Sequence, residues 1–236
     1  MNWGFDIDGC VANIMQPMLD NIAKMYGYKL TTADITTFSI EECTNLSRAK
    51  VYEVVNRTLA DVDNIHPYLG AIEFLKYYHS ITGGTIEFIT ARWDREATNR
   101  QISKWLIDIP FNITYSKGEH KFKSANKRDI KVFVDDRLEV ATILANQGIK
   151  VLLLNREWNQ LDVSKIDNII RVKDWDEIKD YFDGSWYGTI IHYVISVMRK
   201  YKRSNGNLAK FITKRRKQND LWKDYSPVRE DSSKFR

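Results

Sequence analysis

The sequence predicts an α/β fold, a Rossmann-like parallel sheet of about five strands with helices on both faces. Short apolar segments rich in β-branched residues alternate along the chain with longer segments of helical periodicity. Polar residues gather where several of the short segments end. A chain of 236 residues, 43% hydrophobic and 28% charged, has room for one core domain with an insertion or appendage, or for two small domains.

Five segments are expected to form strands, because each is a short apolar run followed by polar residues or by a turn. They are Asn2–Asp8, Gly84–Arg92, Phe111–Ser116, Ile130–Arg137 and Gly148–Asn155.

Helical patterns separate these strands, at Pro67–Ile81, Arg95–Ile109 and Arg137–Ile149. Strands that alternate with helices of this length are typical of a parallel sheet covered on both faces.

An insertion is expected after the first strand, because the connection to residues 66–67 is far too long for a simple crossover. Its helical segments Ile14–Gly27 and Asn45–Leu59 predict a small helical cap. We therefore expect a core of residues 1–12 and 67–183, a cap of residues 13–66, and a basic C-terminal extension of residues 184–236.

Polar side chains lie at the carboxyl ends of three expected strands, where ligands bind in open parallel sheets. They are Asp6 and Asp8, Thr90 and Arg92, and Asp135 and Asp136. A single such acid is usually a helix cap or a loop residue, but three ends together predict a site. Crowded carboxylates repel one another unless a cation lies among them, and an all-oxygen ligand set favours Mg²⁺ and phosphoryl chemistry.

The first pair of acids stands two positions apart in the stretch from Gly4 to Ala12. In an ideal strand, Asp6 and Asp8 would share one face. The turn that Gly9 permits then lets both reach one ligand.

Four motifs resemble, in order and strand position, those of the haloacid dehalogenase-like (HAD) phosphatases. They are Asp6–Cys10, Ile89–Arg92, a lysine-bearing segment at Lys121–Lys127, and Val132–Asp136. Leu152–Gln160 and Val172–Phe182 are similar, more narrowly, to the 5′(3′)-deoxyribonucleotidases and their bacterial and phage relatives. The resemblance covers residues 1–182.

The resemblance implies a role for each motif residue. Asp6 would be the nucleophile that becomes an aspartyl-phosphate, and Asp8 the general acid and base. Asp135 would hold Mg²⁺ with Asp6 and the backbone carbonyl of Asp8, and Asp136 would support that shell. Thr90 would bind the phosphate, helped by backbone N–H groups of the loop that follows it.

A lysine would neutralise the nucleophile and the phosphoryl charge. The candidates are Lys121, Lys123 and Lys127. We expect Lys123, because a helix over the following segment, Ser124–Ile130, would place its side chain at the helix start beside the phosphate.

Residues that follow two of the strands are expected to contact the substrate: Ala91, Arg92, Trp93 and Asn155. The deoxyribonucleotidases have a serine after the motif threonine, where this chain has Ala91 and Arg92. Arg92 could bind phosphate through two hydrogen bonds, or it could pair with the neighbouring acids. Four aromatic residues of the cap could stack on a nucleobase, although such residues are more often core. They are Tyr26, Tyr28, Phe38 and Tyr52.

The net charge of +5 belongs to the C-terminal part, since residues 185–236 contain 13 lysines and arginines against 4 acidic residues. Its first third has an apolar helical face that would dock on the core or on a second subunit of a homodimer. The basic segment Lys214–Gln218, with Trp222 and Tyr225, could track a nucleic-acid backbone, or be a solvated terminus.

Three functions are therefore weighed. The first is a Mg²⁺-dependent phosphatase of nucleoside monophosphates, and the second a polynucleotide 3′-phosphatase acting on DNA or RNA ends. The third is a non-catalytic nucleic-acid-binding protein on the same fold, which has no evident need for Asp8.

The two cysteines are expected to be buried and unpaired. Met1 leads directly into the first strand, so we expect no signal peptide, no membrane span and a cytoplasmic location.

Overall fold

The computed structural model describes residues 2–116, 120–185 and 188. The chain divides into two units, Met1–Asp180 and Tyr181–Arg236, and every labelled element below belongs to the first. The expected apolar helix after residue 185 and the basic segment Lys214–Gln218 lie outside the described residues.

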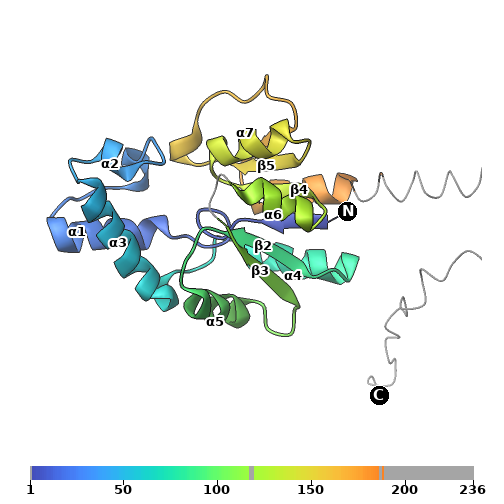
Figure 1. Cartoon of the computed structure of the whole chain (residues 1–236), viewed down its shortest axis with the longest axis horizontal. Helices are drawn as coiled ribbons and strands as arrows, with labels where there is room; N and C mark the ends of the chain where they lie inside the picture. The colour runs from blue at the N-terminus through green and yellow to red at the C-terminus, as the bar shows by residue number, and fades with distance from the viewer. Residues whose placement is uncertain (1, 117–119, 186–187, 189–236) are drawn as a thin grey trace, which may run out of the picture. The chain divides into compact units, whose positions relative to one another are not determined.

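A six-stranded parallel sheet forms the centre of the first unit, in the order β3-β2-β1-β4-β5-β6 (Figure 1). The α/β fold with a parallel sheet is thus confirmed. The strands are β1 (Asn2–Phe5), β2 (Ile86–Thr90), β3 (Phe111–Tyr115), β4 (Ile130–Asp135), β5 (Lys150–Leu154) and β6 (Ile169–Val172).

The sixth strand was not expected from the sequence. It is only four residues long and lies at the edge of the sheet beside β5, so it carries too few residues to show a period. The expectation of about five strands was therefore one strand short.

Four helices connect the strands, and each lies where a helical pattern or a short lysine-rich segment was noted. They are α4 (Ala71–Thr82), α5 (Arg95–Trp105), α6 (Lys121–Lys127) and α7 (Leu138–Asn146). The Asp94 side chain caps α5 by accepting a hydrogen bond from the Ala97 N–H at 2.9 Å. A further helix begins at Trp175.

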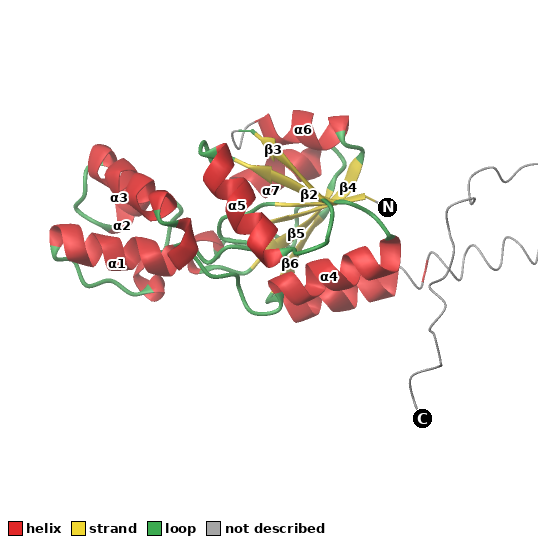
Figure 2. Ribbon diagram, turned by 90° about the horizontal axis from the view of Figure 1, so that it is seen from below, coloured by secondary structure: helices red, strands yellow, loops and turns green. Residues whose placement is uncertain are grey.

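Both faces of the sheet are buried, as parallel strands require. Figure 2 shows α4 on one side of the sheet and α6 and α7 on the other. On the α6 and α7 side, Phe133 and Leu153 belong to a buried hydrophobic cluster. On the opposite side, Trp3 and Phe5 pack against Phe74 of α4, with ring centroids 5.9 and 6.2 Å away.

Residues 13–66 form a helical insertion between β1 and α4, drawn in blue to cyan in Figure 1. Its elements are α1 (Met15–Tyr26), the 3₁₀ turn η1 (Thr32–Asp34), α2 (Ile40–Cys43), α3 (Arg48–Ala60) and the 3₁₀ turn η2 (Val62–Asn64). Its two connections run side by side, because the Asn13 N–H donates to the His66 carbonyl and the Tyr68 N–H to the Val11 carbonyl. Helices α1 and α3 pack together through buried faces that include Ile22 and Val54.

Among the described residues, no helix combines the length and the apolar character needed to cross a lipid bilayer.

Candidate active site

Three neighbouring strands of the sheet end at the same place. Phe5, the last residue of β1, is paired with Phe88 of β2 on one side and with Val134 of β4 on the other. The residues that follow or close these strands are Asp6, Thr90 and Asp135, with 6%, 1% and 0% of their surface exposed. The prediction that polar residues at the ends of three strands lie together is confirmed.

The first strand ends earlier than expected, at Phe5 and not at Asp8. A tight loop follows, in which the Ile7 carbonyl accepts hydrogen bonds from the N–H groups of Val11 and Ala12. Asp6 and Asp8 therefore belong to a loop and not to one face of a strand. Both still line one cleft, but they contact different partners.

Lys121 joins the first and third strand ends. Its Nζ atom lies 2.7 Å from Asp6 Oδ2 and 2.9 Å from Asp135 Oδ2, and only 3% of its side chain is exposed. Burial alone would lower the pKa of Lys121, but attraction to Asp135 and Asp6 outweighs burial and raises it well above the usual range. The lysine is therefore a cation at any physiological pH.

The expectation that Lys123 would be the site lysine was wrong. Helix α6 begins at Lys121 rather than after Lys123, so the first helical residue is the one that points into the sheet end. Lys123 lies two positions further on and is exposed. Lys127, at the last position of the helix, is exposed as well.

Asp6 is a buried carboxylate held from two sides. Its Oδ1 accepts a hydrogen bond from the Ile7 N–H at 2.8 Å, while its Oδ2 pairs with Lys121. Burial raises the pKa of Asp6 to about 7; Lys121 opposes the shift, and the charges of Asp135 and Asp8 add to it.

Asp136 follows the last residue of β4 and contacts the loop after β5. Its Oδ2 accepts a hydrogen bond from Trp158 Nε1 at 2.9 Å, and Asn159 Nδ2 donates to its carbonyl at 2.6 Å. Burial, with the charges of Asp135 and Asp6, raises the pKa of Asp136 to about 8.

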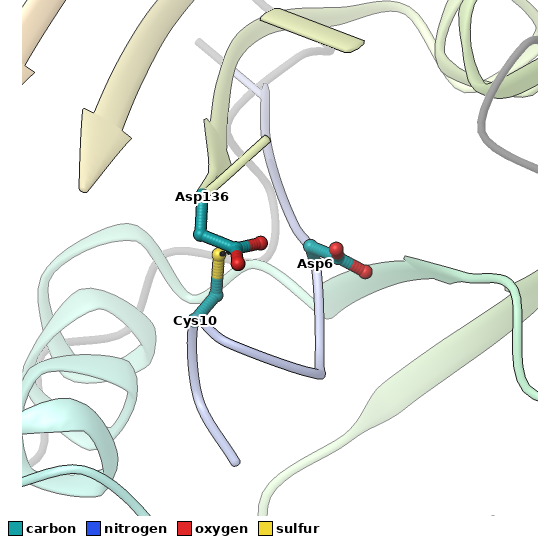
Figure 3. Close-up of side chains that lie close together, drawn as sticks. All are labelled: Asp6, Cys10 and Asp136. Atoms are coloured by element: carbon teal, nitrogen blue, oxygen red, sulfur yellow. Dashed lines mark hydrogen bonds between the residues drawn. The ribbon is translucent and has the colours of Figure 1, made fainter. Parts of the chain in front are cut away.

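The oxygens of Asp6 and Asp136 and the sulfur of Cys10 lie within 4.8 Å of one another. Figure 3 shows the Cys10 thiol close to the Asp136 carboxylate, with Asp6 on the adjacent segment. Burial, with the charge of Asp136, raises the pKa of the Cys10 thiol well above its usual range, so the thiol stays neutral. Two crowded carboxylates beside a neutral thiol offer oxygen ligands, which fits a hard ion such as Mg²⁺.

Asp135, the last residue of β4, and Asp136, which follows it, have different partners. Asp135 was expected to hold the metal, but its Oδ2 pairs with Lys121 and its Oδ1 accepts the Arg137 N–H at 2.9 Å. Asp136 is the one that lies with Asp6 in the metal-type cluster. Only Asp135 is turned towards Lys121, at the start of α6.

Arg92 pairs with Asp8, which is one of the two alternatives left open by the sequence. Its Nε lies 2.9 Å from Asp8 Oδ2 and its Nη2 2.6 Å from Asp8 Oδ1. The Arg92 N–H also donates to the Thr90 hydroxyl at 3.2 Å. Asp8 is thus oriented by an arginine, and its carboxylate is not in the metal-type cluster.

Asn155 does not line the cleft, contrary to expectation. Its Oδ1 accepts hydrogen bonds from Gln160 Nε2 and Arg171 Nη1, at 3.0 and 3.2 Å, so the side chain is turned into a surface network. Trp158, three residues further along the same loop, is the residue that reaches the cleft.

A cleft of about 500 Å³ opens above the strand ends, between them and the helical insertion. Thr90, Ala91 and Arg92 line its floor, and Trp93 lies at its side with 54% of its surface exposed. Of the four aromatic residues singled out in the insertion, Phe38 and Tyr52 line the cleft; Tyr26 and Tyr28 do not.

Two arginines of the cleft were not anticipated from the sequence. The guanidinium carbon of Arg137 lies 3.9 Å above the centre of the Phe38 ring, and that of Arg48 lies 5.8 Å from the Tyr52 ring. Arg137 directly follows the paired acids, which is the only sequence signal that could have pointed to it. The two arginines make this side of the cleft suited to an anionic or aromatic group.

Gly9→Ala is expected to disturb the site more than the fold. Gly9 has φ +78°, and a Cβ there would lie 2.0 Å from Asp136 Oδ2. The left-handed backbone alone costs an alanine about 1 kcal/mol, and Asp136 must also move. Gly27→Ala is the matched control, because Gly27 has φ +77° with nothing within 4 Å. We expect Gly9→Ala to lose more stability than Gly27→Ala in thermal unfolding, because only the first has a clash, and only Gly9→Ala to lose most of its activity; equal activity in the two would contradict this arrangement of the site.

Comparison with known proteins gives relatives but no matching family model. A curated nucleotidase of Clostridium acetobutylicum is 24% identical over 185 residues, which are 78% of this chain and 94% of the relative. A hydrolase of Pseudomonas syringae superposes with a TM-score of 0.50 at 13% identity, covering 78% of this chain and 98% of that one.

A protein of Thermotoga maritima, provisionally assigned as a β-phosphoglucomutase, superposes with a TM-score of 0.51 at 15% identity. The match covers 78% of this chain and 99% of that protein. Identities this low establish the fold alone. The parallel sheet and these structural neighbours confirm the Rossmann-like α/β fold expected from the resemblance to the haloacid dehalogenase-like phosphatases.

Proposed function

We propose that the protein is a Mg²⁺-dependent phosphomonoesterase that removes phosphate from nucleoside monophosphates through an aspartyl-phosphate. One observation carries the proposal: the Asp6 carboxylate, paired with Lys121 at 2.7 Å, lies on the floor of a cleft that also contains Thr90 and Asp8. A carboxylate nucleophile, a cation and a hydroxyl beside a second carboxylate are what stepwise phosphoryl transfer needs.

In the first step, an Asp6 oxygen attacks phosphorus and the bond from phosphorus to the ester oxygen breaks. Asp8 gives its proton to the leaving oxygen. In the second step, Asp8 takes a proton from water, the water oxygen attacks phosphorus, and the bond to Asp6 breaks to release inorganic phosphate. Lys121 and the Thr90 hydroxyl would stabilise the charge on the phosphoryl oxygens.

The carboxylates of Asp6 and Asp136, with the backbone carbonyl of Asp8, would hold Mg²⁺. The bound ion would supply further positive charge for the phosphoryl oxygens. Asp135 would act on the lysine and not on the ion, since Lys121 Nζ lies 2.9 Å from it.

The rest of the cleft supports a nucleoside as the leaving group. Phe38, Tyr52 and Trp93 expose 45%, 54% and 54% of their surfaces and line the cleft together with apolar side chains of α1 and α3. Exposed rings beside a polar floor suit a planar base attached to a phosphate. The curated relative from C. acetobutylicum is a nucleotidase, which agrees with this choice.

Added Mg²⁺ is expected to stabilise the protein against thermal unfolding through Asp136. At a concentration 100 times the dissociation constant, binding adds about 2.7 kcal/mol, which for a domain of this size raises Tm by about 5–10 °C. Asp136→Asn should lose most of this increase, while Asp129→Asn, at a side chain that is 75% exposed, should keep it. An unchanged Mg²⁺ response in Asp136→Asn would show that the ion binds elsewhere.

A panel of phosphate esters, each with Mg²⁺ and with a chelator, tests the proposal. It contains deoxynucleoside and ribonucleoside 5′- and 3′-monophosphates, sugar phosphates, and oligonucleotides with a 3′-phosphate. Mg²⁺-dependent release of phosphate from mononucleotides is the expected result. Release only from oligonucleotides would favour the polynucleotide 3′-phosphatase, and tight oligonucleotide binding without turnover would favour the non-catalytic protein.

A further inference from the structure

The Arg92 side chain is buried and has all three of its nitrogen atoms in hydrogen bonds. Only 1% of the side chain is exposed. Its Nε and Nη2 donate to the Asp8 carboxylate at 2.9 and 2.6 Å, and its Nη1 donates to Gln101 Oε1 at 2.7 Å. A guanidinium engaged in this way holds a carboxylate in one plane and at one orientation.

Gln101 continues this chain of hydrogen bonds to the helical insertion. It lies on α5 and is 2% exposed. Its Nε2 donates to the backbone carbonyls of Val62 and Ile65, the second at 3.1 Å. Both carbonyls lie in the segment by which the insertion returns to the core, just before His66 hydrogen-bonds Asn13.

The amide of Gln101 can serve this double role because one end accepts and the other donates. Oε1 accepts a hydrogen bond from Arg92 Nη1, and the two N–H groups of Nε2 donate one hydrogen bond to each carbonyl. A second contact joins the same elements, an ion pair of Lys104 on α5 with Asp63 of η2. The orientation of Asp8 is therefore linked to the position of residues 62–65 through two buried side chains.

We propose that Arg92 is a positioning residue that aims Asp8 at the leaving oxygen, and that Gln101 couples this orientation to the return segment of the cap. The proposal rests on the proposed function, because it assigns to Asp8 the transfer of a proton to the leaving group. In this way the cap influences the orientation of Asp8 through Gln101 and Arg92, and no cap side chain needs to contact Asp8.

The dependence of the rate on the leaving group tests this role. An alkyl phosphate, such as a nucleoside 5′-monophosphate or glycerol phosphate, has a poor leaving oxygen that must be protonated as the bond to phosphorus breaks. p-Nitrophenolate leaves without a proton. The second step needs Asp8 as a base whichever substrate is used, so the comparison is made on the first step, as the release of the leaving group in a single turnover. In that step a misdirected Asp8 should slow the first class of substrate and leave p-nitrophenyl phosphate nearly unaffected. The ratio of the two rates does not change with the fraction of folded protein.

The variants are Arg92→Lys, which keeps the charge but loses the paired geometry, and Gln101→Glu, which can still accept from Arg92 but has no proton for the two carbonyls. Arg95→Lys is the matched control, because Arg95 is exposed and stacks on Tyr115. We expect Arg92→Lys to lower the single-turnover rate of leaving-group release from the alkyl phosphate by about 10²-fold and Gln101→Glu by about 10-fold, with the same rate for p-nitrophenyl phosphate changed by less than about 3-fold in both. Guanidinium ion should restore part of the alkyl phosphate rate to Arg92→Ala.

Three outcomes would overturn the proposal. Equal losses on both substrates would make Arg92 a purely structural residue, and an increase in KM with unchanged kcat would make it a phosphate contact. An unaffected Gln101→Glu would remove the coupling to the cap. If the protein hydrolyses glycerol phosphate but not nucleotides, the proposed substrate class is wrong, and the role of Arg92 can still be measured on glycerol phosphate. If the parent protein hydrolyses no phosphate ester, the proposed function and the role of Arg92 are both wrong.

Discussion

Asp6→Asn is expected to abolish turnover and to leave the fold intact. An amide oxygen cannot form the aspartyl-phosphate, and removing the nucleophile from a stepwise mechanism lowers kcat by about 10⁴-fold or more. Asparagine has nearly the same shape and can still accept the Ile7 N–H that Asp6 Oδ1 accepts at 2.8 Å. Lys121 keeps its second partner, Asp135, at 2.9 Å.

The measurement pairs phosphate release with circular dichroism and thermal unfolding of the same preparation. Asp129→Asn makes the same chemical change at an exposed site and should behave like the parent protein. Parent protein denatured during turnover should contain protein-bound phosphate that hydroxylamine releases, as expected of an acyl phosphate, and Asp6→Asn should lack it. An active, folded Asp6→Asn protein would refute Asp6 as the nucleophile.

Lys121→Ala is expected to reduce both activity and stability. It leaves Asp6 and Asp135, which are 6% and 0% exposed, without the cation that lies between them. Removing one partner of a buried ion pair costs about 3–5 kcal/mol, and loss of a charge that stabilises the transition state costs about 10²–10³-fold in kcat. Denaturant unfolding in metal-free buffer measures the first effect, and kcat on the best nucleotide measures the second.

Lys123→Ala is the matched control, since Lys123 lies on the same helix, two residues away, and is exposed. Surface substitutions of this kind change stability by less than about 0.5 kcal/mol. If activity survives Lys121→Ala and is lost with Lys123→Ala, Lys123 is the site lysine, as expected from the sequence. That result would contradict the role that the structure suggests for Lys121.

The strand-end residues could be found from the sequence because their arrangement follows from local rules. β1, β2 and β4 are apolar runs that stop at polar residues, and parallel strands bring their carboxyl ends to one edge. Asp6, Thr90 and Asp135 meet there as expected. The edge strand β6 was missed because four residues, Ile169–Val172, are too few for a periodic signal.

The partners of those residues could not be found in the same way. Whether Lys121 or Lys123 reaches Asp6 depends on the residue at which α6 begins, and helix boundaries are the least certain part of a sequence-based assignment. Asn155 and Trp158 lie on one loop, and only the course of that loop turns the tryptophan towards Asp136.

By itself, the sequence determined the parallel sheet, the helical insertion and the acids that close the central strands, because hydrophobic period and residue type are properties of the chain. Only the tertiary structure decided which acid faces the lysine, which faces the metal-type cluster, and that Arg92 holds Asp8. Those choices depend on side-chain direction and on contacts between residues far apart in the chain, such as Lys121 with Asp6 and Arg92 with Asp8, which are 115 and 84 positions apart. Pairings over such separations are set by packing of the whole domain, which no local pattern encodes.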